Sequence, residues 1–444
     1  TSSPLRKRTN TELPWCLPDA GISVIDEETA VKKMKILVVG GGGREHAIVW
    51  KLAQSRHKPE LFCAPGNGGI AEIAKCVPIK ATDISAMVDF AVKNDIDLTV
   101  VAPDDPLAMG MVDALQAAGK RAFGPTAAAA LIEASKGFSK QLMKKYGIPT
   151  ADYRIFDNYA EADEYLKSAP MPIVIKADGL ALGKGVIIAE NYSQASAAAK
   201  DMLEGGAFGG AGSTIVIEEY MTGPEMSMLC FTDGKTVVPM VTAQDHKRAL
   251  DNDMGLNTGG MGAFSPSMQY DSSNDKWLMD NVLLPTVRAM EKEGRPFKGV
   301  LYFGLMLTKN GIKVLEYNAR FGDPETQAVL PRLKSDLVDI FEAIIDERLA
   351  EVKISWSDKA AVCVVLASGG YPEKYETGFE ISGIEQAEKM GALVFHAGTA
   401  VRDGRTVTSG GRVLGVTALG DSVQQARILA YAAAEKINFQ NKHM

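Results

Sequence analysis

The stretch VLYFGLMLTKNGIKVLEYNARFGDPETQ, residues 300–327, predicts a β-hairpin that ends in an acidic, turn-rich loop. Asn310 and Gly311 mark the hairpin turn, because both residues tolerate the positive φ that a tight turn demands. Side chains alternate between the two sides of a strand, so this turn assigns each residue of the second strand to a face. One face carries Val314, Glu316, Asn318 and Arg320, and the other carries Leu315, Tyr317 and Ala319.

The first of these faces carries groups suited to chemistry. On a rigid strand, the carboxylate of Glu316, the carboxamide oxygen of Asn318 and the guanidinium of Arg320 can hold a hard cation beside an anionic ligand. This face therefore predicts a site for a metal ion and phosphate. The alternative is the charged outer face of an ordinary antiparallel sheet.

Size and composition are those of an ordinary globular protein, with 444 residues of which 46% are hydrophobic and 23% are charged. A net charge of −7 argues against nucleic acid as a partner, since such proteins usually carry a basic surplus. The five cysteines show no CxxC spacing, so we expect no zinc site, no disulfide framework and a reducing, cytoplasmic compartment. No apolar run approaches the roughly 18 residues of a membrane span, which predicts a soluble protein without a membrane partner.

The chain divides into an extension and three globular parts. Residues 1–33 contain several prolines and a basic LRKR, and the sequence assigns them no role. Residues 34–134 alternate apolar strands with helices, which predicts an α/β domain with a doubly wound parallel sheet. Residues 135–334 mix strands and flanking helices as an α+β body, and residues 335–444 form a small third α+β unit.

Two glycine-rich stretches resemble nucleotide-binding motifs only in part. In GLALGKGV, three residues separate Gly179 from Gly183 and no Ser or Thr follows Lys184, so it is not a P-loop. The run of residues 40–43 lacks the third glycine of a dinucleotide fingerprint, which argues against nicotinamide binding. A glycine run that opens a helix still presents backbone N–H groups to a phosphate. The alternative is a plain tight turn.

Lys176 and Lys136 predict a phosphate clamp. Lys176 ends an apolar strand and shares its face with Val174 and Asp178, a position that is costly for a lysine unless it meets an anion. The loop of residues 179–185 can fold over that anion and exclude water. Lys136 lies in the first turn of the preceding helix and is a second cation. The alternative is a pair of solvated surface lysines.

Two further segments carry polar groups where strands end. IVIEEYMTGPEMS, residues 215–227, presents Glu218, Glu219 and Glu225, which can read an adenine edge and ribose hydroxyls or else form an acidic sheet edge. The predicted loop AQDHKRALDNDMGLNTGGMGAF, residues 243–264, is too long and polar for packing alone to explain. No trio of nucleophile, base and orienting group appears, so covalent catalysis by Ser or Cys has little support.

Seven motifs occur in this order along the chain: GGGGREHA, APGN, IKADGLALGKGV, IEEYMTGPEMS, QDHKR, NTGGMGA and NARFGDPETQ. With them the chain resembles the glycinamide ribonucleotide synthetases, also called phosphoribosylamine–glycine ligases, of the ATP-grasp superfamily. The likeness extends from Met34 to about the last residue. The resemblance implies that residues 135–334 form a two-lobed ATP-grasp core, with a mobile lid at about 150–220, between the N-terminal domain and a small C-terminal domain.

The resemblance implies a ligase of de novo purine biosynthesis. ATP, as co-substrate, would phosphorylate the glycine carboxylate, and the amine of 5-phosphoribosylamine would attack the glycyl phosphate, giving glycinamide ribonucleotide, ADP and phosphate. The metal would be Mg²⁺, with Mn²⁺ as an alternative. The expected partners are these small molecules and other enzymes of the purine pathway. The rival interpretation is another ATP-grasp carboxylate–amine ligase with a different acid or amine.

The resemblance also assigns site residues. The metal ligands would be Glu316 and Asn318. ATP would be bound by Lys136, Lys176, Lys184, Glu218, Glu219, Tyr220, Met221 and Glu225. The catalytic residues would be Arg320, Lys247, Arg248 and Asp245, and the two substrates would be bound by Gly42, Gly43, Arg44, Glu45, Asn67, Asn257, Thr258, Gly259, Gly260 and Asp323. Of these, Asp245 and Asp323 would receive the glycine ammonium.

One loop departs from the family pattern. The family usually has GPE, one further residue and Pro after the third strand of the N-terminal domain, whereas this chain has APDDP, with Ala102 and Asp104 in place of Gly and Glu. The resemblance therefore assigns no contact to phosphoribosylamine at this loop. A non-catalytic nucleotide-binding regulator would require lesions at Lys176, Glu316 or Asn318, and the sequence shows none.

Overall fold

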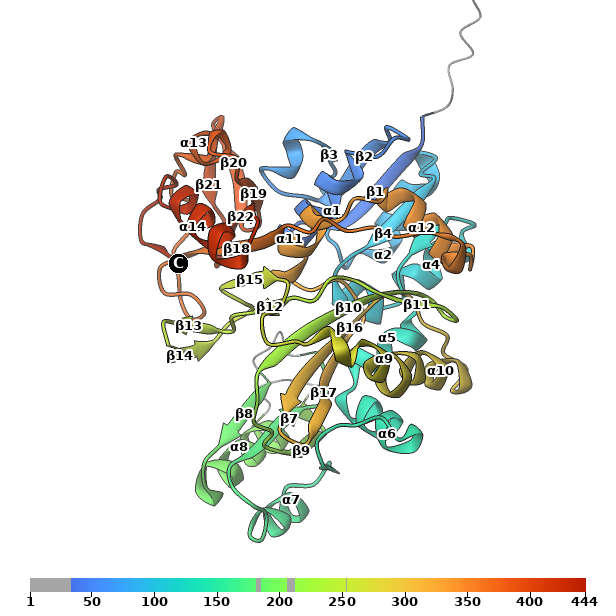
Figure 1. Cartoon of the computed structure of the whole chain (residues 1–444), viewed down its shortest axis with the longest axis vertical. Coiled ribbons are helices and arrows are strands. Elements are labelled where there is room, and N and C mark those ends of the chain that lie inside the picture. Colours follow the sequence, from blue (N-terminus) through green and yellow to red (C-terminus); the bar gives the residue numbers. More distant parts are fainter. Residues whose placement is uncertain (1–32, 181–184, 206–211, 253) are drawn as a thin grey trace, which may run out of the picture. The chain divides into compact units, whose positions relative to one another are not determined.

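The computed structural model describes residues 33–180, 185–205, 212–252 and 254–444, so all but the last residue of the predicted extension lie outside the described part of the chain. The N-terminal residues form a five-stranded parallel sheet in the order β3-β2-β1-β4-β5 (Figure 1). Its strands are β1 (Lys35–Gly40), β2 (Glu60–Pro65), β3 (Lys75–Cys76), β4 (Leu98–Val101) and β5 (Ala122–Phe123). Its helices are α1 (Gly43–Leu52), α2 (Ile84–Lys93), α3 (Asp104–Ala108), α4 (Met111–Ala117) and α5 (Ala127–Ala134).

Strand β1 shows why this sheet forms. Leu37 and Val39 pack into one hydrophobic cluster, whereas Ile36 and Val38 pack into another, so both faces of the strand are buried. A strand buried on both faces requires the continuous apolar sequence that KILVV provides. The predicted doubly wound parallel sheet is confirmed.

The middle of the chain contains two four-stranded antiparallel sheets. The first has the order β6-β9-β7-β8 and is covered by helices α7 (Tyr159–Leu166) and α8 (Tyr192–Glu204). Its strands are β6 (Tyr153–Phe156), β7 (Ile173–Ala177), β8 (Val186–Ala189) and β9 (Ile215–Glu219). The second has the order β11-β10-β16-β17, with strands β10 (Glu225–Asp233), β11 (Val237–Pro239), β16 (Lys298–Thr308) and β17 (Gly311–Asn318).

Helix α6 (Lys136–Tyr146) begins and ends where its capping residues require. The Ser135 hydroxyl accepts a hydrogen bond from the Phe138 N–H, which satisfies a free donor of the first turn. Gly147 ends the helix in the left-handed conformation with φ +70°. Helices α9 (Asp275–Leu278) and α10 (Leu284–Lys292) follow further along the chain. The predicted start and stop of α6 are confirmed.

Strand β17 contains a β-bulge that corrects the predicted faces. Gly304 pairs with Glu316 but Leu305 pairs with Val314, so Leu315 is an extra residue in β17. Val314 therefore joins Tyr317 in the hydrophobic core, and its predicted place beside Glu316 was wrong. The turn also differs, because Gly311 has φ +109° whereas Asn310 does not have a positive φ.

The C-terminal sheet, which also includes two strands from the middle of the chain, has the order β12-β15-β18-β22-β19, with β23 (Lys442–His443) beside β18. Its strands are β12 (Gln244–Asp245), β15 (Gly262–Ser265), β18 (Ala360–Ser368), β19 (Leu393–His396) and β22 (Arg412–Gly420). The predicted structureless loop of residues 243–264 was therefore wrong, because it contributes two strands to this sheet. Between them lies a hairpin of β13 (Arg248–Leu250) and β14 (Met254–Asn257).

The remaining elements connect or cover these sheets. They are α11 (Glu325–Val329), α12 (Leu337–Ile345), α13 (Ile384–Lys389), β20 (Thr399–Arg402), β21 (Arg405–Thr408) and α14 (Val423–Ala434). Among the described cysteines, Cys63, Cys76, Cys230 and Cys363 are free thiols. No helix in the described part of the chain combines the length and the apolar character needed to cross a bilayer.

Candidate active site

Three buried charged side chains meet where α6, β7 and β9 come together. The Lys140 Nζ lies 3.0 Å and the Lys176 Nζ 3.1 Å from the same Oε2 atom of Glu218. Lys140 and Glu218 are only 1% and 2% exposed. The Lys140 ammonium also donates to the Thr150 hydroxyl, which in turn donates to the Val314 carbonyl next to the bulge.

This cluster carries an excess positive charge. Burial would raise the pKa of Glu218, but Lys176 and Lys140 outweigh it and hold that pKa below its usual value. Burial lowers the pKa of Lys140 to about 8, although Glu218 opposes the shift. The other Glu218 oxygen, Oε1, is buried and has no hydrogen-bond partner among the described residues. Two ammonium groups with one carboxylate suit an anionic ligand.

Lys140 was not predicted, although the sequence carries a signal for it. Lys140 follows Lys136 by four residues, and residues four apart share a helix face. Lys136 donates to the Gly179 carbonyl at 3.0 Å, whereas its neighbour Asp178 accepts from the Gly137 N–H and the Ser135 hydroxyl. Asp178 therefore helps to cap α6. The Lys136 ammonium contacts Gly179, the first residue of the segment predicted to close over the phosphates.

Glu316 and Asn318 fit a divalent cation. No hydrogen bond from a described residue reaches the Glu316 carboxylate. Burial alone would raise the pKa of Glu316, but Lys247, Lys176 and Lys136 outweigh it and lower that pKa. The Glu316 carboxylate and the carboxamide oxygen of Asn318, two positions further along the chain, are the hard oxygen donors that Mg²⁺ prefers. The nearby ammonium groups suit phosphates.

Arg320 is held by two acidic residues. Its Nη2 lies 2.9 Å from Glu133 and 4.0 Å from Asp104, and it donates to the Asn318 Oδ1 at 3.2 Å. Glu133 also accepts from the Ala319 N–H at 2.7 Å. Glu133 was not predicted, because no local pattern marks a glutamate at the end of α5 as a partner of β17. The structure thus brings Arg320 to the side of Asn318.

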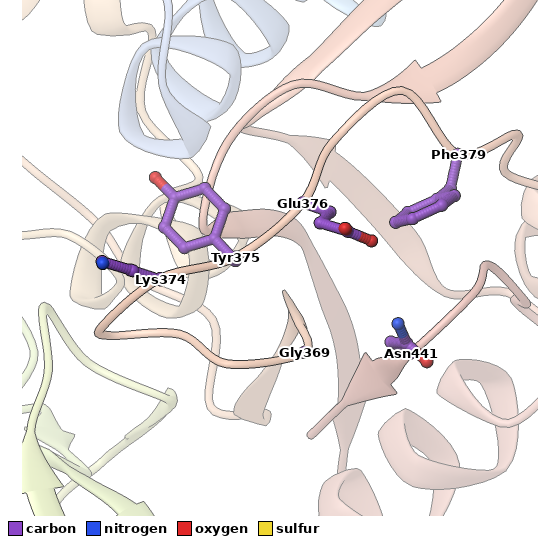
Figure 2. Close-up of a pocket in the computed structure, with 6 residues that line it drawn as sticks. All are labelled: Gly369, Lys374, Tyr375, Glu376, Phe379 and Asn441. Carbon is purple, nitrogen blue, oxygen red and sulfur yellow. The ribbon is translucent and has the colours of Figure 1, made fainter.

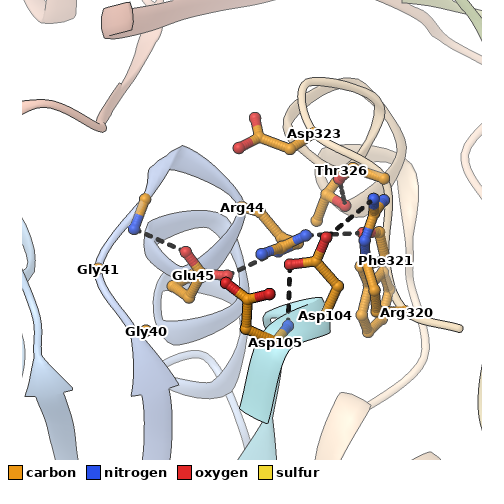
Figure 3. Close-up of polar contacts among 12 residues, drawn as sticks. Gly40, Gly41, Arg44, Glu45, Asp104, Asp105, Arg320, Phe321, Asp323 and Thr326 are labelled. Carbon is orange, nitrogen blue, oxygen red and sulfur yellow. Dashed lines mark hydrogen bonds and ion pairs between the residues drawn. The ribbon is translucent and has the colours of Figure 1, made fainter. Parts of the chain in front are cut away.

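The start of α1 faces this segment (Figure 3). Glu45 accepts from the Gly42 N–H and from the Arg44 Nε, both at 2.6 Å. The Arg44 guanidinium also donates to the Phe321 carbonyl at 3.2 Å. Burial would raise the pKa of Asp104, but Arg320 and Arg44 outweigh it and hold that pKa below its usual value. The atypical APDDP loop therefore turns its first carboxylate toward two arginines.

Asn67 makes four hydrogen bonds within the protein. Its Nδ2 donates to the carbonyls of Gly41 and His396, and its Oδ1 accepts from the N–H groups of Gly69 and Ile70. These bonds satisfy the amide completely, so Asn67 shapes the glycine-rich turn. The His396 N–H donates to His46 Nδ1 at 2.7 Å, so both the backbone N–H and the backbone carbonyl of His396 are hydrogen-bonded to side chains.

The segment that begins β12 forms a second ionic group. Lys247 lies 2.6 Å from Glu225, and both side chains are partly exposed. Burial raises the pKa of Asp245 to about 7, with Glu325 and Glu225 adding to the shift and Lys247 opposing it. Arg248 instead donates to the Gly255 carbonyl within the β13–β14 hairpin at 2.8 Å, so the structure does not bring it to Glu316.

The structure brings only part of the predicted adenine-reading segment, residues 218–221, to the buried lysine cluster. Glu219 pairs with Lys313 at 3.2 Å, Tyr220 is 39% exposed, and Met221 is buried against Met306. Lys184 lies outside the described residues. Glu218 is therefore the member of this segment that joins the buried lysines.

The remaining predicted substrate residues lie beside the C-terminal sheet. Thr258 donates to the Lys247 carbonyl at 2.8 Å, and Asn257 pairs with Arg248 across the β13–β14 hairpin. Asp323 forms an ion pair with Arg412, a residue that was not predicted. Gly43 lies in the first turn of α1, where an added Cβ would meet Gln327.

Two cavities lie away from these groups. One of about 250 Å³ is lined by Gly369, Lys374, Tyr375, Glu376, Phe379 and Asn441 (Figure 2). Another of about 660 Å³ is lined by residues of α1 and β19, including His46 and His396. Neither cavity contains a predicted site residue.

Family comparisons cover most of the chain. The Phosphoribosylglycinamide synthetase N domain matches residues 34–133, the ATP-grasp (A) domain of the same family matches residues 134–326, and the C domain matches residues 361–444. These matches name the family that the sequence motifs resemble.

Curated relatives agree. A phosphoribosylamine–glycine ligase of Caldanaerobacter subterraneus subsp. tengcongensis is 50% identical over 92% of this chain and 97% of the relative. The trifunctional purine biosynthetic protein adenosine-3 of Gallus gallus is 50% identical over 91% of this chain, which spans 41% of that longer protein.

Solved structures share the fold. The phosphoribosylamine–glycine ligase of Thermotoga maritima has a TM-score of 0.80 and 34% identity, covering 92% of this chain and 98% of that one. A biotin carboxylase of Campylobacter jejuni has a TM-score of 0.71 over 94% of each chain at 14% identity, which shows a common fold alone. The predicted resemblance is confirmed, and the chain belongs to the phosphoribosylglycinamide synthetase family.

Proposed function

We propose that the chain is an ATP-dependent ligase that joins glycine to 5-phosphoribosylamine and releases ADP and phosphate. The observation that carries the proposal is that three lysines, Lys247, Lys176 and Lys136, act electrostatically on the Glu316 carboxylate and outweigh the effect of its burial. This arrangement suits a nucleotide triphosphate with its metal ion. The names of the relatives supply the acid and the amine.

The residues act mainly by electrostatics. The glycine carboxylate must approach the γ-phosphate against like charge, and the three lysine ammonium groups offset that repulsion. A carboxylate oxygen bonds to phosphorus as the bond to ADP breaks, giving glycyl phosphate. The amine of phosphoribosylamine then attacks the glycyl carbonyl, the new C–N bond forms, the amine loses a proton, and phosphate leaves.

A bound Mg²⁺ or Mn²⁺ ion, held by Glu316 and Asn318, would neutralise phosphate charge and order the phosphate oxygens. Arg320 positions the Asn318 oxygen through their 3.2 Å hydrogen bond, and Glu133 fixes Arg320 in turn. Lys140 is a positioning residue for the phosphate clamp, because it shares Glu218 with Lys176 and so sets where the Lys176 ammonium lies.

The N-terminal turn is the proposed place for phosphoribosylamine. The N–H groups of the turn that opens α1 and the Arg44 guanidinium suit its phosphate. Glu45 and Asn67 position this turn through the hydrogen bonds that they make with it. In the same proposal, Glu225 and residues 218–221 receive the nucleoside, Asn257 to Gly260 and Asp323 lie on the glycine side, and Lys184 is an additional cation.

We propose domain bounds at 34–134, 135–334 and 335–444, with a lid at about 150–220. The free thiols among the described cysteines support a reducing, cytoplasmic location. Other enzymes of purine synthesis are proposed partners, since the relative from Gallus gallus is named as a trifunctional purine biosynthetic protein.

The test measures phosphate release from ATP and magnesium with purified protein. Release should require both glycine and phosphoribosylamine, and mass spectrometry should detect glycinamide ribonucleotide. Release with a different acid or amine in place of either substrate would favour the rival ligase. Tight nucleotide binding without release for any acid and amine pair would favour a regulator.

We expect the KM for glycine to fall about tenfold between pH 6 and pH 8, because only ionised Asp245 attracts the glycine ammonium. Its pKa of about 7 makes the carboxylate mostly protonated at the lower pH and mostly ionised at the higher. Steady-state rates against glycine concentration measure this, with the KM for ATP as the control. The Asp245→Asn variant should lose this pH dependence. An unchanged slope in that variant would remove Asp245 from the glycine site.

A further inference from the structure

Arg412, the first residue of β22, joins two loops that precede β18 in the sequence. Its Nη1 donates to the Gly259 carbonyl at 2.5 Å and to the Asp323 carbonyl at 2.9 Å. Its Nη2 donates to the Asp323 Oδ2 at 2.9 Å. The planar guanidinium therefore binds three oxygens from two separate loops, an arrangement that a lysine cannot reproduce.

The glycines of the NTGG stretch are explained by this contact. A Cβ on Gly259 would lie 3.1 Å from the Arg412 Cζ and 3.2 Å from the Tyr371 hydroxyl oxygen. A Cβ on Gly260 would lie within 2.4 Å of a Pro324 ring atom, and Gly260 has φ +108°. The Gly259 N–H also donates to the Tyr371 hydroxyl at 2.9 Å. These two glycines let the loop pack closely against the Arg412 side chain and the Asp323–Pro324 turn.

Asp323 is committed to protein partners on both carboxylate oxygens. Its Oδ1 accepts from the Gln327 side chain at 2.7 Å, and its Oδ2 accepts from Arg412. Burial would raise the pKa of Asp323, but Arg412 and Arg44 outweigh it and lower that pKa. An ionised aspartate that is already paired is a poor sole partner for a substrate ammonium. It is well suited to hold a loop in place.

We propose that Arg412 is a positioning residue for the glycine end of the active site. It fixes the Asn257 to Gly260 loop against the Asp323 turn, and so sets the spacing of the backbone and side-chain groups that receive glycine. This inference rests on the proposed ligase function. It assigns to strand β22 a part in building the proposed glycine site.

The Arg412→Lys and Arg412→Ala variants test this role. We expect each to raise the KM for glycine by about 10- to 100-fold, the effect of losing charge-assisted hydrogen bonds that hold the loops. The KM for ATP and the kcat at saturating glycine should each change by less than about threefold. Guanidinium ion added at concentrations far below those that unfold the protein should restore part of the glycine affinity of the Ala variant.

The matched control is Arg405→Ala, which removes the same side chain from β21 in the same part of the chain. Arg405 pairs with Glu380 on the surface, and its side chain is 68% exposed. This control should leave all three kinetic constants unchanged. Thermal unfolding of every variant separates loss of fold from loss of positioning, and the Lys variant decides the question if the Ala variant unfolds.

Two results would overturn the inference. One is a Lys variant with the glycine KM of the unaltered protein, because charge alone would then suffice. The other is an equal rise in the KM values for glycine and ATP, which indicates a general structural defect. Both results can be obtained only if the unaltered protein consumes glycine in the proposed reaction. Failure of that activity instead refutes the proposed function, so the two failures are distinguishable.

Discussion

The Glu316→Gln variant should lose about 100-fold or more in kcat, because the amide keeps the shape of the side chain but removes the negative charge that a divalent cation needs. Lys247, Lys176 and Lys136 favour the ionised form of this carboxylate, so its loss also removes part of the negative charge that acts on the three lysines. Turnover measured across a range of magnesium concentrations checks this. The defect should be largest when magnesium is limiting.

The control for this variant is Glu380→Gln, which removes an exposed carboxylate that pairs with Arg405 on the surface. It should leave kcat unchanged. The assignment of Glu316 would not survive a kcat that equals that of the unaltered protein at limiting magnesium. Circular dichroism and thermal unfolding establish that the variant is folded.

The Glu218→Gln variant should lower the free energy of unfolding by about 3 kcal/mol, because breaking a buried ion pair leaves its partner uncompensated. Here two ammonium groups, those of Lys140 and Lys176, lose their common carboxylate. Denaturant unfolding at pH 7 measures the loss. A lysine with a lowered pKa binds fewer protons in the folded than in the unfolded state, so the stability of this variant should recover as pH rises toward 10.

Glu219→Gln is the matched control, since it changes the next residue of the same strand. Glu219 pairs with Lys313, and its side chain is 46% exposed, so its loss should cost less than about 1 kcal/mol. Equal effects of the two substitutions, or a stability of Glu218→Gln that is independent of pH, would contradict the buried cluster.

Some of this site could be predicted from sequence because the relevant pattern is local. Glu316, Asn318 and Arg320 follow a two-residue period, and Lys176 stands out at the end of an apolar strand. Both signals depend only on neighbouring residues. The bulge at Leu315 broke the same period without a local signal, so the predicted faces were wrong for Val314 and Leu315.

The partners of these residues could not be predicted in the same way. Glu133 meets Arg320, and Arg412 meets Asp323, only because chain segments about 90 residues apart or more fold together. A single sequence gives no measure of which distant charges meet. The pairing of β15 with β18 is another such case, and it converted a predicted loop into part of a sheet.

That pairing has a consequence for the order in which the protein matures. Strand β15 leaves the ribosome almost a hundred residues before β18, its neighbour in the sheet. Until those later strands emerge, Asp245 at the end of β12 has no finished sheet to anchor it. Nascent chains that stop before β18 can thus complete their parallel sheet while the proposed glycine site is still unformed.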